Sequence, residues 1–120
     1  MHDIQAGFGL IEITPLVGTP LVGQFRVRYA TGVNDPLYAR ILALRQGEND
    51  AESVLIVVLD VCKVVGEDIE RVRDEITTTL PVPRERIWFY GTHTHTGPAL
   101  TSSFETPRAE EYAEWLAPQV

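Results

Sequence analysis

The spacing of apolar positions predicts several short strands and two helices. The first apolar segment, 4–14, contains two glycines, which indicates a strand that another backbone or a bend approaches closely. Two further apolar runs, 38–45 and 53–61, flank the polar turn 47–50 and predict an antiparallel hairpin. The second of these runs is almost continuously β-branched, which is typical of a strand covered on both faces.

A helix and another strand follow this hairpin. Apolar residues recur at helical spacing from Ile69 to Leu80, Glu67 and Asp68 favour the helix N-terminus, and Pro81 ends the pattern. The apolar run 87–90 then forms a strand parallel to the one before the helix, with a right-handed crossover. We therefore expect an α/β fold: a mixed sheet with an antiparallel hairpin and a right-handed βαβ unit, and helices packed on the sheet.

Two other segments complete the chain. Residues 15–36 are rich in Gly and Pro but too apolar for a disordered loop, so we expect them to fold against the domain and line a pocket. A last helix is predicted to begin at Thr106, with Pro107 in its first position, and to end at Pro118. Only two residues follow Pro118, so this helix is expected to have nothing beyond it to pack against, which indicates a partial domain.

Composition and charge narrow the functional classes. The 120 residues are 44% apolar, as expected for one small globular domain, and the net charge of −7 argues against a nucleic-acid partner. No apolar run is long enough for a membrane span. The single cysteine, Cys62, and a start without a signal peptide favour a cytoplasmic location.

The clearest chemical signal is Gly-Thr-His-Thr-His-Thr-Gly-Pro at 91–98, directly after the strand 87–90. In α/β sheets ligands bind at the carboxyl ends of strands. In an extended backbone, residues two apart point to the same side, about 6.6 Å from each other. His93 and His95 therefore predict a metal or catalytic site, against the alternative of two loop histidines without a role. His2, near the N-terminus, is expected to have no role.

Two residues at the end of the run 53–61, Asp60 within it and Cys62 directly after it, are weaker candidates. Asp60 reaches the same sheet edge, where a carboxylate can accept a hydrogen bond from a metal-binding imidazole, but it can equally cap the following loop. Cys62 is either a soft metal ligand or a small core residue, and the second interpretation is favoured. Arg40 is expected to pair with a carboxylate such as Asp35.

Three stretches of the sequence, 6–15, 30–40 and 91–99, resemble the N-terminal domain of the neutral/alkaline, non-lysosomal ceramidases. The resemblance extends from Ala6 to Leu116. It implies a zinc-dependent, ceramidase-like amidohydrolase acting on linear amides, which cleaves the N-acyl bond of ceramide into sphingosine and a fatty acid. By this resemblance His93 is a zinc ligand, His95 binds the substrate or the developing oxyanion, and Asp60 has a supporting catalytic role.

The resemblance also implies that the site is incomplete. Family members complete the zinc site with another His, a Glu and a Tyr from much later in a longer chain, and no histidine follows His95. Because a catalytic zinc usually has three protein ligands, we expect the remainder of a longer chain to complete the site. Residues 1–120 are interpreted as the N-terminal part of a larger catalytic domain, inactive alone and weak in zinc binding.

Two other functions remain open. The first is another HxH metallohydrolase, although the metallo-β-lactamase pattern continues with Asp-His where Thr96-Gly97 stands here, and an amidohydrolase barrel carries its HxH on the first strand. The second is a non-catalytic, acidic α/β binding module with incidental histidines. Within the favoured reading, the substrate is ceramide or a related N-acyl amide.

Overall fold

The computed structural model describes residues 3–120, so the expectation for His2 lies outside the described residues. The strands are β1 (Ile4–Glu12), β2 (Pro20–Leu21), β3 (Arg28–Tyr29), β4 (Tyr38–Gln46), β5 (Val54–Leu59) and β6 (Ile87–Gly91). The α-helices are α1 (Gly66–Thr79) and α2 (Glu110–Leu116), and short 3-10 helices lie at Asp50–Glu52, Arg84–Arg86 and Ala117–Gln119.

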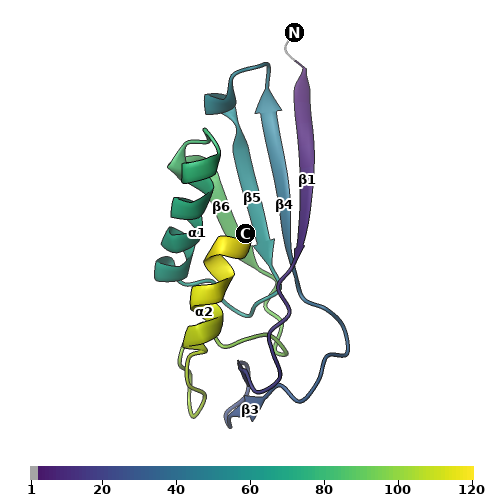
Figure 1. Ribbon diagram of the computed structural model, residues 1–120, viewed down its shortest axis with the longest axis vertical. Coiled ribbons are helices and arrows are strands. Elements are labelled where there is room, and N and C mark those ends of the chain that lie inside the picture. The colour runs from purple at the N-terminus through teal and green to yellow at the C-terminus, as the bar shows by residue number, and fades with distance from the viewer. Residues whose placement is uncertain (1–2) are drawn as a thin grey trace.

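Four strands form the main sheet in the order β1-β4-β5-β6 (Figure 1). The pairs β1–β4 and β4–β5 are antiparallel, whereas β5 and β6 are parallel and are connected through α1. The predicted mixed α/β fold is confirmed. In the parallel pair Leu59 stands opposite Gly91, so the carboxyl ends of β5 and β6 lie side by side and their loops leave the sheet together.

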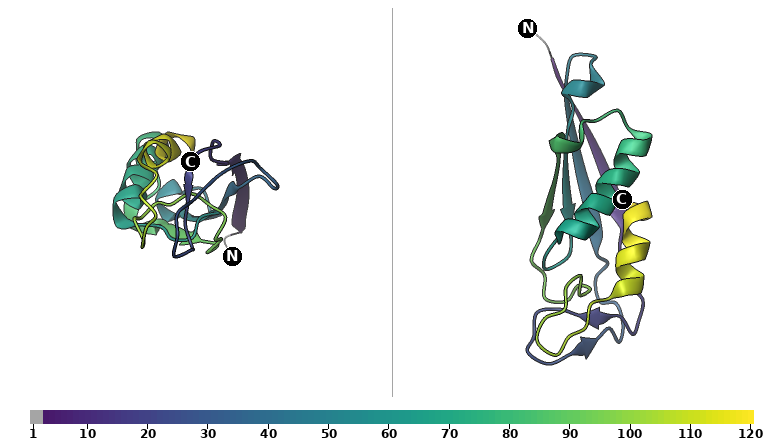
Figure 2. Two further views of the ribbon diagram at one scale, coloured as in Figure 1. Left: turned by 90° about the horizontal axis from the view of Figure 1, so that it is seen from below. Right: turned by 90° about the vertical axis from the view of Figure 1, so that its left-hand side faces the viewer.

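Both α-helices cover the same face of the sheet (Figure 2). In β5 the residues Leu55, Val57 and Leu59 are buried beneath these helices, whereas the alternate residues are only half-buried. The expectation that this strand is covered on both faces is therefore wrong. A continuous β-branched run arises here because the second face is also apolar, although no element of residues 3–120 covers it.

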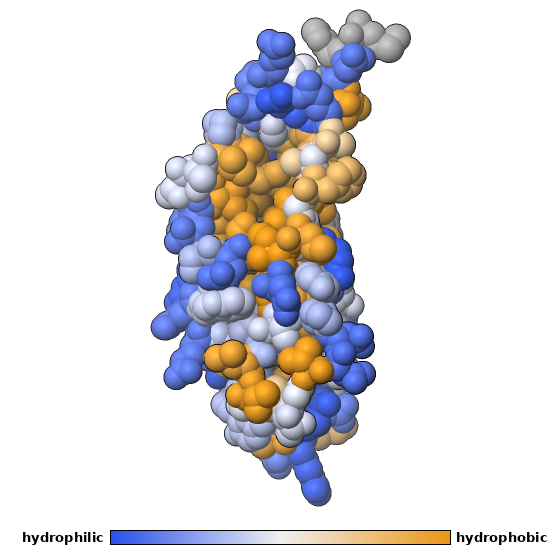
Figure 3. All heavy atoms as spheres, turned by 45° about the vertical axis from the view of Figure 1, so that its right-hand side comes forward, coloured by the Kyte–Doolittle hydropathy of each residue, from blue (hydrophilic) through white to orange (hydrophobic). Residues whose placement is uncertain are grey.

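The uncovered face carries apolar residues from all four strands. Cross-strand pairing places Phe8, Leu42, Ile56 and Trp88 in one row across the sheet. Strand β1 forms one edge and is exposed along almost its whole length. Figure 3, in which the β1 side comes forward, looks onto the opposite, helix-bearing side and shows further apolar residues around a hollow there.

The segment between β1 and β4 forms a cap at one end of the sheet, where β2 and β3 pair as a small hairpin (Figure 1). Val22 and Ala30 are buried, but Leu16, Val17 and Phe25 are exposed, so the segment is folded against the domain only in part. As predicted, it lines a cleft, of about 750 Å³, together with Thr96 from the loop after β6 and other residues. These are Thr14, Pro15, Leu21, Arg28 to Asp35 and Leu37.

The last helix begins later than predicted, at Glu110 rather than at Thr106. Ser103 and Thr106 exchange two backbone hydrogen bonds of 3.0 and 2.9 Å and form a tight turn. Beyond this turn, the Arg108 guanidinium binds the buried Asp68 carboxylate at the start of α1, with Nη2 to Oδ1 at 2.6 Å. The chain before Glu110 is thus held by these contacts in a non-helical path.

The helix α2 also has a packing partner, contrary to the expectation from the sequence. Tyr112, Ala113 and Leu116 are buried in the main core, and the Tyr112 hydroxyl donates a hydrogen bond of 2.6 Å to the carbonyl of Ile13. Burial raises the pKa of the Tyr112 hydroxyl, which therefore stays protonated as a donor. None of the helices in residues 3–120 is both long and apolar enough to cross a membrane.

Candidate metal centre

The loops that follow β5 and β6 lie against each other at the carboxyl edge of the sheet. The amide of Thr92 donates to the carbonyl of Leu59 at 2.9 Å, and the amide of His93 donates to the carbonyl of Val61 at 3.0 Å. A Cβ atom at Gly91 would lie 2.9 Å from the same Val61 carbonyl oxygen. The glycine of the motif therefore permits the close approach that brings His93 to the loop after β5.

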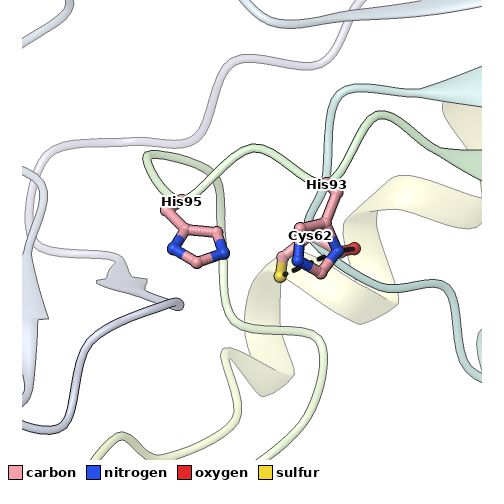
Figure 4. Close-up of side chains that lie close together, drawn as sticks. All are labelled: Cys62, His93 and His95. Carbon is pink, nitrogen blue, oxygen red and sulfur yellow. Dashed lines mark hydrogen bonds between the residues drawn. The ribbon is translucent and has the colours of Figure 1, made fainter.

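The backbone at His93 is left-handed, with φ of 64°, rather than extended as the sequence argument assumed. Left-handed backbone in a residue with a side chain costs about 1–3 kcal/mol and occurs preferentially at functional sites. The imidazole Nδ1 lies 3.0 Å from the carbonyl oxygen of Cys62 (Figure 4). With Nδ1 donating its proton to this carbonyl, Nε2 is unprotonated and available as a ligand, as in most metal-binding histidines.

His95 lies beside His93, with 5.1 Å between the ring centroids and both rings on the same side of the loop (Figure 4). Its carbonyl accepts a hydrogen bond from the guanidinium of Arg28, which also donates to the carbonyl of Val22 at 3.1 Å. The ring lies over Gly23, where a Cβ atom would be 2.4 Å from the imidazole Cγ. The β2–β3 hairpin thus positions His95, which no sequence pattern indicated.

Cys62 is the third residue of the cluster. Its Sγ is 3.8 Å from Nδ1 of His93, and one ligand atom from each of Cys62, His93 and His95 lies within 4.8 Å of the others. The cysteine is buried and packs with Val22 and Ala99, so the favoured interpretation as a core residue is compatible with its packing. The structure adds that its sulfur faces the two histidines.

Asp60 has other partners. Its carboxylate accepts hydrogen bonds from the amide of Tyr38 at 2.9 Å and from Nη1 of Arg40 at 2.7 Å, so Arg40 pairs with Asp60 and not with Asp35 as expected. Burial alone would raise the pKa of Asp60, but the hydrogen bonds from Arg40, Tyr38 and Thr92 and the Arg40 charge together lower it. A catalytic role for Asp60 stays a prediction.

The cluster of Cys62, His93 and His95 fits a zinc ion by its chemistry. Thiolate sulfur and imidazole nitrogen are the ligands that zinc prefers, and mixed Cys and His sets occur in catalytic zinc sites. Both histidines are exposed, so a substrate can reach an ion that they hold. The cluster is therefore suited to contribute ligands to a metal ion.

Comparison with known proteins finds solved structures that share the fold of this chain. No protein-family model and no curated protein matches the sequence. Among solved structures, the neutral ceramidase from Pseudomonas aeruginosa matches with a TM-score of 0.73 and 19% identity over 82% of this chain. A ceramidase complexed with C2 matches with a TM-score of 0.71 and 19% identity, also over 82% of this chain. The chain has the fold of part of neutral ceramidase.

This likeness confirms the relationship in fold that the sequence motifs predicted. The matched region is 16% of the length of each ceramidase chain, so the present chain spans a small part of those proteins. At 19% identity the comparison shows that the fold is shared with ceramidase. Whether the chemistry is shared depends on the residues of the site.

Proposed function

We propose that this chain forms part of the active site of a zinc-dependent amide hydrolase resembling neutral ceramidase. The reaction is cleavage of the N-acyl bond of ceramide or of a related N-acyl amide. The observation that supports it is the hydrogen bond of 3.0 Å between His93 Nδ1 and the Cys62 carbonyl. This bond leaves Nε2 of a backbone-strained histidine free to bind a metal, on a fold shared with ceramidases.

Each residue has a defined task in this proposal. A bound zinc ion supplies Lewis-acid polarisation of the amide carbonyl and lowers the pKa of a water molecule to about 7. His93 holds the ion through Nε2. The exposed ring of His95 has its centroid 5.1 Å from that of the His93 ring. It donates a hydrogen bond to the oxygen of the substrate carbonyl as negative charge develops there. Asp60 holds Arg40 and the start of β4 in place beneath the site.

An apolar cleft also supports an amide with an acyl chain as the substrate. A second cleft, of about 670 Å³, lies between the segment 14–20 and α2. Leu16, Val17 and Trp115 line it and are exposed. We propose that this cleft accepts the acyl chain of the substrate. The site is completed by residues outside this chain.

The test is an assay of the protein, in its longest natural form, against a panel of N-acyl amides with and without a chelator. We expect chelation to abolish hydrolysis, zinc to restore it, and His93→Ala to lower kcat by at least about a hundredfold. His2→Ala, which removes the histidine to which the sequence assigns no role, serves as the control. Full activity of His93→Ala would exclude the zinc mechanism and favour the binding-module alternative or a different hydrolase.

A further inference from the structure

Arg28, the first residue of β3, connects the β2–β3 hairpin to the histidine loop. Nη2 of its guanidinium donates one hydrogen bond to the carbonyl of Val22, at 3.1 Å, within the hairpin segment. The same nitrogen donates a second hydrogen bond to the carbonyl of His95, which lies 67 residues further along the chain. One half-buried side chain therefore joins the hairpin to the backbone of the residue proposed to stabilise the oxyanion.

The surroundings of Arg28 differ from those of most arginines in this chain. Six arginines within residues 3–120 form ion pairs with carboxylates: Arg40, Arg45, Arg71, Arg73, Arg84 and Arg108. Arg28 forms no ion pair within the same residues, and its Nε is buried without a hydrogen-bond partner. A buried N–H group without a partner lowers stability, so its presence in a native structure calls for an explanation. Stability alone does not account for this side chain.

The backbone of the histidine loop is held against the hairpin mainly beyond His95. The amide of Val22 donates to the carbonyl of Gly97 at 3.2 Å, and the amide of Ala99 donates to the carbonyl of Pro20 at 2.9 Å. At His95 itself, the bond from the guanidinium is the only hydrogen bond that its backbone or its ring makes within residues 3–120. The position of His95 therefore depends on this one bond and on the packing of its ring.

We infer that Arg28 is a positioning residue for His95, because its guanidinium holds the backbone from which the imidazole reaches the oxygen of the substrate carbonyl. The inference rests on the role of His95 in the proposed function. A donor stabilises an oxyanion only at hydrogen-bond distance, and a misplacement of about 1 Å costs as much as about a hundredfold in rate. Since an oxyanion contact is made only in the transition state, loss of Arg28 should lower kcat and leave KM unchanged.

The first experiment follows the His95 ring directly by NMR, in the longest natural form of the protein, without metal and labelled with ¹³C at Cε1 of histidine. The signals of His93 and His95 are assigned by their loss in His93→Gln and His95→Gln. Arg28→Met keeps the aliphatic stem and removes the donors, so we expect the His95 signal to shift and the His93 signal to stay in place. Arg28→Lys keeps a charged donor and should shift the His95 signal less. An unchanged His95 signal in Arg28→Met would overturn the inference, whether or not the protein is active.

Arg73→Met is the matched control, because Nε and Nη2 of Arg73 also donate to a backbone carbonyl, that of Ile87, at 3.2 and 3.0 Å. Ile87 begins β6, at the end of the strand opposite to the histidine loop. Arg73→Met also loses an ion pair with Glu70, and it is expected to lower stability without shifting the His95 signal. A shift as large as that in Arg28→Met would show that the signal reports general loosening of the fold, and would also overturn the inference.

The second experiment measures hydrolysis of an N-acyl amide by the same variants. We expect Arg28→Met to lower kcat about tenfold and to change KM by less than about twofold, with partial recovery of kcat in Arg28→Lys. In a His95→Ala background Arg28→Met should cause no further loss, because the residue that it positions is absent. Equal losses in the two backgrounds would contradict the inference. Hydrolysis that persists undiminished in His93→Ala would contradict the proposed function instead, and the histidine signals would still test the role of Arg28.

Discussion

The left-handed backbone at His93 is the residue-scale feature on which the site depends. The sequence argument brought His93 and His95 together by assuming an extended backbone, which would point both side chains to one side. The structure instead brings the rings together through a left-handed residue at His93 and a bend at His95. The motif was informative because its glycines and threonines permit this loop, whose path no periodicity describes.

Gly23 provides a residue-scale prediction. Its φ is 100°, and an added Cβ would meet the His95 ring at 2.4 Å, whereas Gly18 has φ of 93° and nothing within 4 Å. Both Gly→Ala variants are expected to lose about 1–2 kcal/mol of unfolding free energy through backbone strain. Only Gly23→Ala should also displace His95 and lower kcat for hydrolysis of an N-acyl amide, by about tenfold. Urea unfolding and the hydrolysis assay of the two variants check this, and equal kcat values would contradict it.

Asp60 predicts a dependence of stability on pH. Its pKa is lowered in the folded protein from the ordinary 3.8, so the carboxylate stabilises the fold above that value and the contribution is lost as pH falls through the folded pKa. Asp60→Asn should therefore be less stable than the wild type at pH 6, with a difference that narrows between about pH 5 and pH 3. Urea midpoints across this range provide the measurement.

The Arg40 partner supplies the control for this titration. In an Arg40→Met background the strongest hydrogen bond that lowers the Asp60 pKa is gone. The added effect of Asp60→Asn should then vary less with pH than in the wild-type background. A difference that stays constant from pH 6 to pH 3 in the wild-type background would show that Asp60 is not the group that titrates.

At the scale of elements, the buried pair of Asp68 and Arg108 connects α1 to the segment before α2. Asp68 has a side-chain exposure of 6% and Arg108 of 15%. The guanidinium also donates to the carbonyl of Leu100, so the pair fixes the chain that follows the histidine loop. Glu67 was an equally good N-terminal acid by sequence, but it forms an exposed pair with Arg71.

The two acidic residues are therefore expected to differ in their effect on stability. Asp68→Asn leaves a buried guanidinium without its counter-charge and is expected to cost about 3 kcal/mol of unfolding free energy. Glu67→Gln, one position earlier in the same helix turn, removes only a solvent-exposed pair and should cost less than about 0.5 kcal/mol. Equilibrium urea unfolding of both variants distinguishes them, and similar losses would contradict the assigned role of the pair.

For the molecule as a whole, the main feature is the uncovered apolar face of the sheet. Phe8 is 84% exposed in an edge strand that has no charge between Ile4 and Ile11. Edge strands normally carry charges, prolines or bulges that prevent association. An extended apolar face next to such an edge is a surface that another polypeptide can cover.

We therefore expect the purified protein to associate as its concentration rises. Phe8→Lys places a charge in the middle of the edge strand and on the open face. It should shift the light-scattering mass towards the monomer without changing the free energy of unfolding by more than about 0.5 kcal/mol. Phe25→Lys changes a phenylalanine that is 75% exposed in the β2–β3 cap and should leave association unchanged. Equal effects of the two variants would show that the sheet face is not responsible.

The sequence by itself determined the order and type of the main elements, because each strand and helix has a local apolar period that sets its own conformation. It also indicated which loop holds the candidate site, since two histidines spaced by one residue after a strand are a local signal. The tertiary structure alone decided that one sheet face stays open, that α2 begins at Glu110, and that Cys62 and Gly23 lie against the two histidines. These outcomes depend on contacts between residues far apart in the chain, such as Asp68 with Arg108 and Arg28 with His95, which local periodicity does not encode.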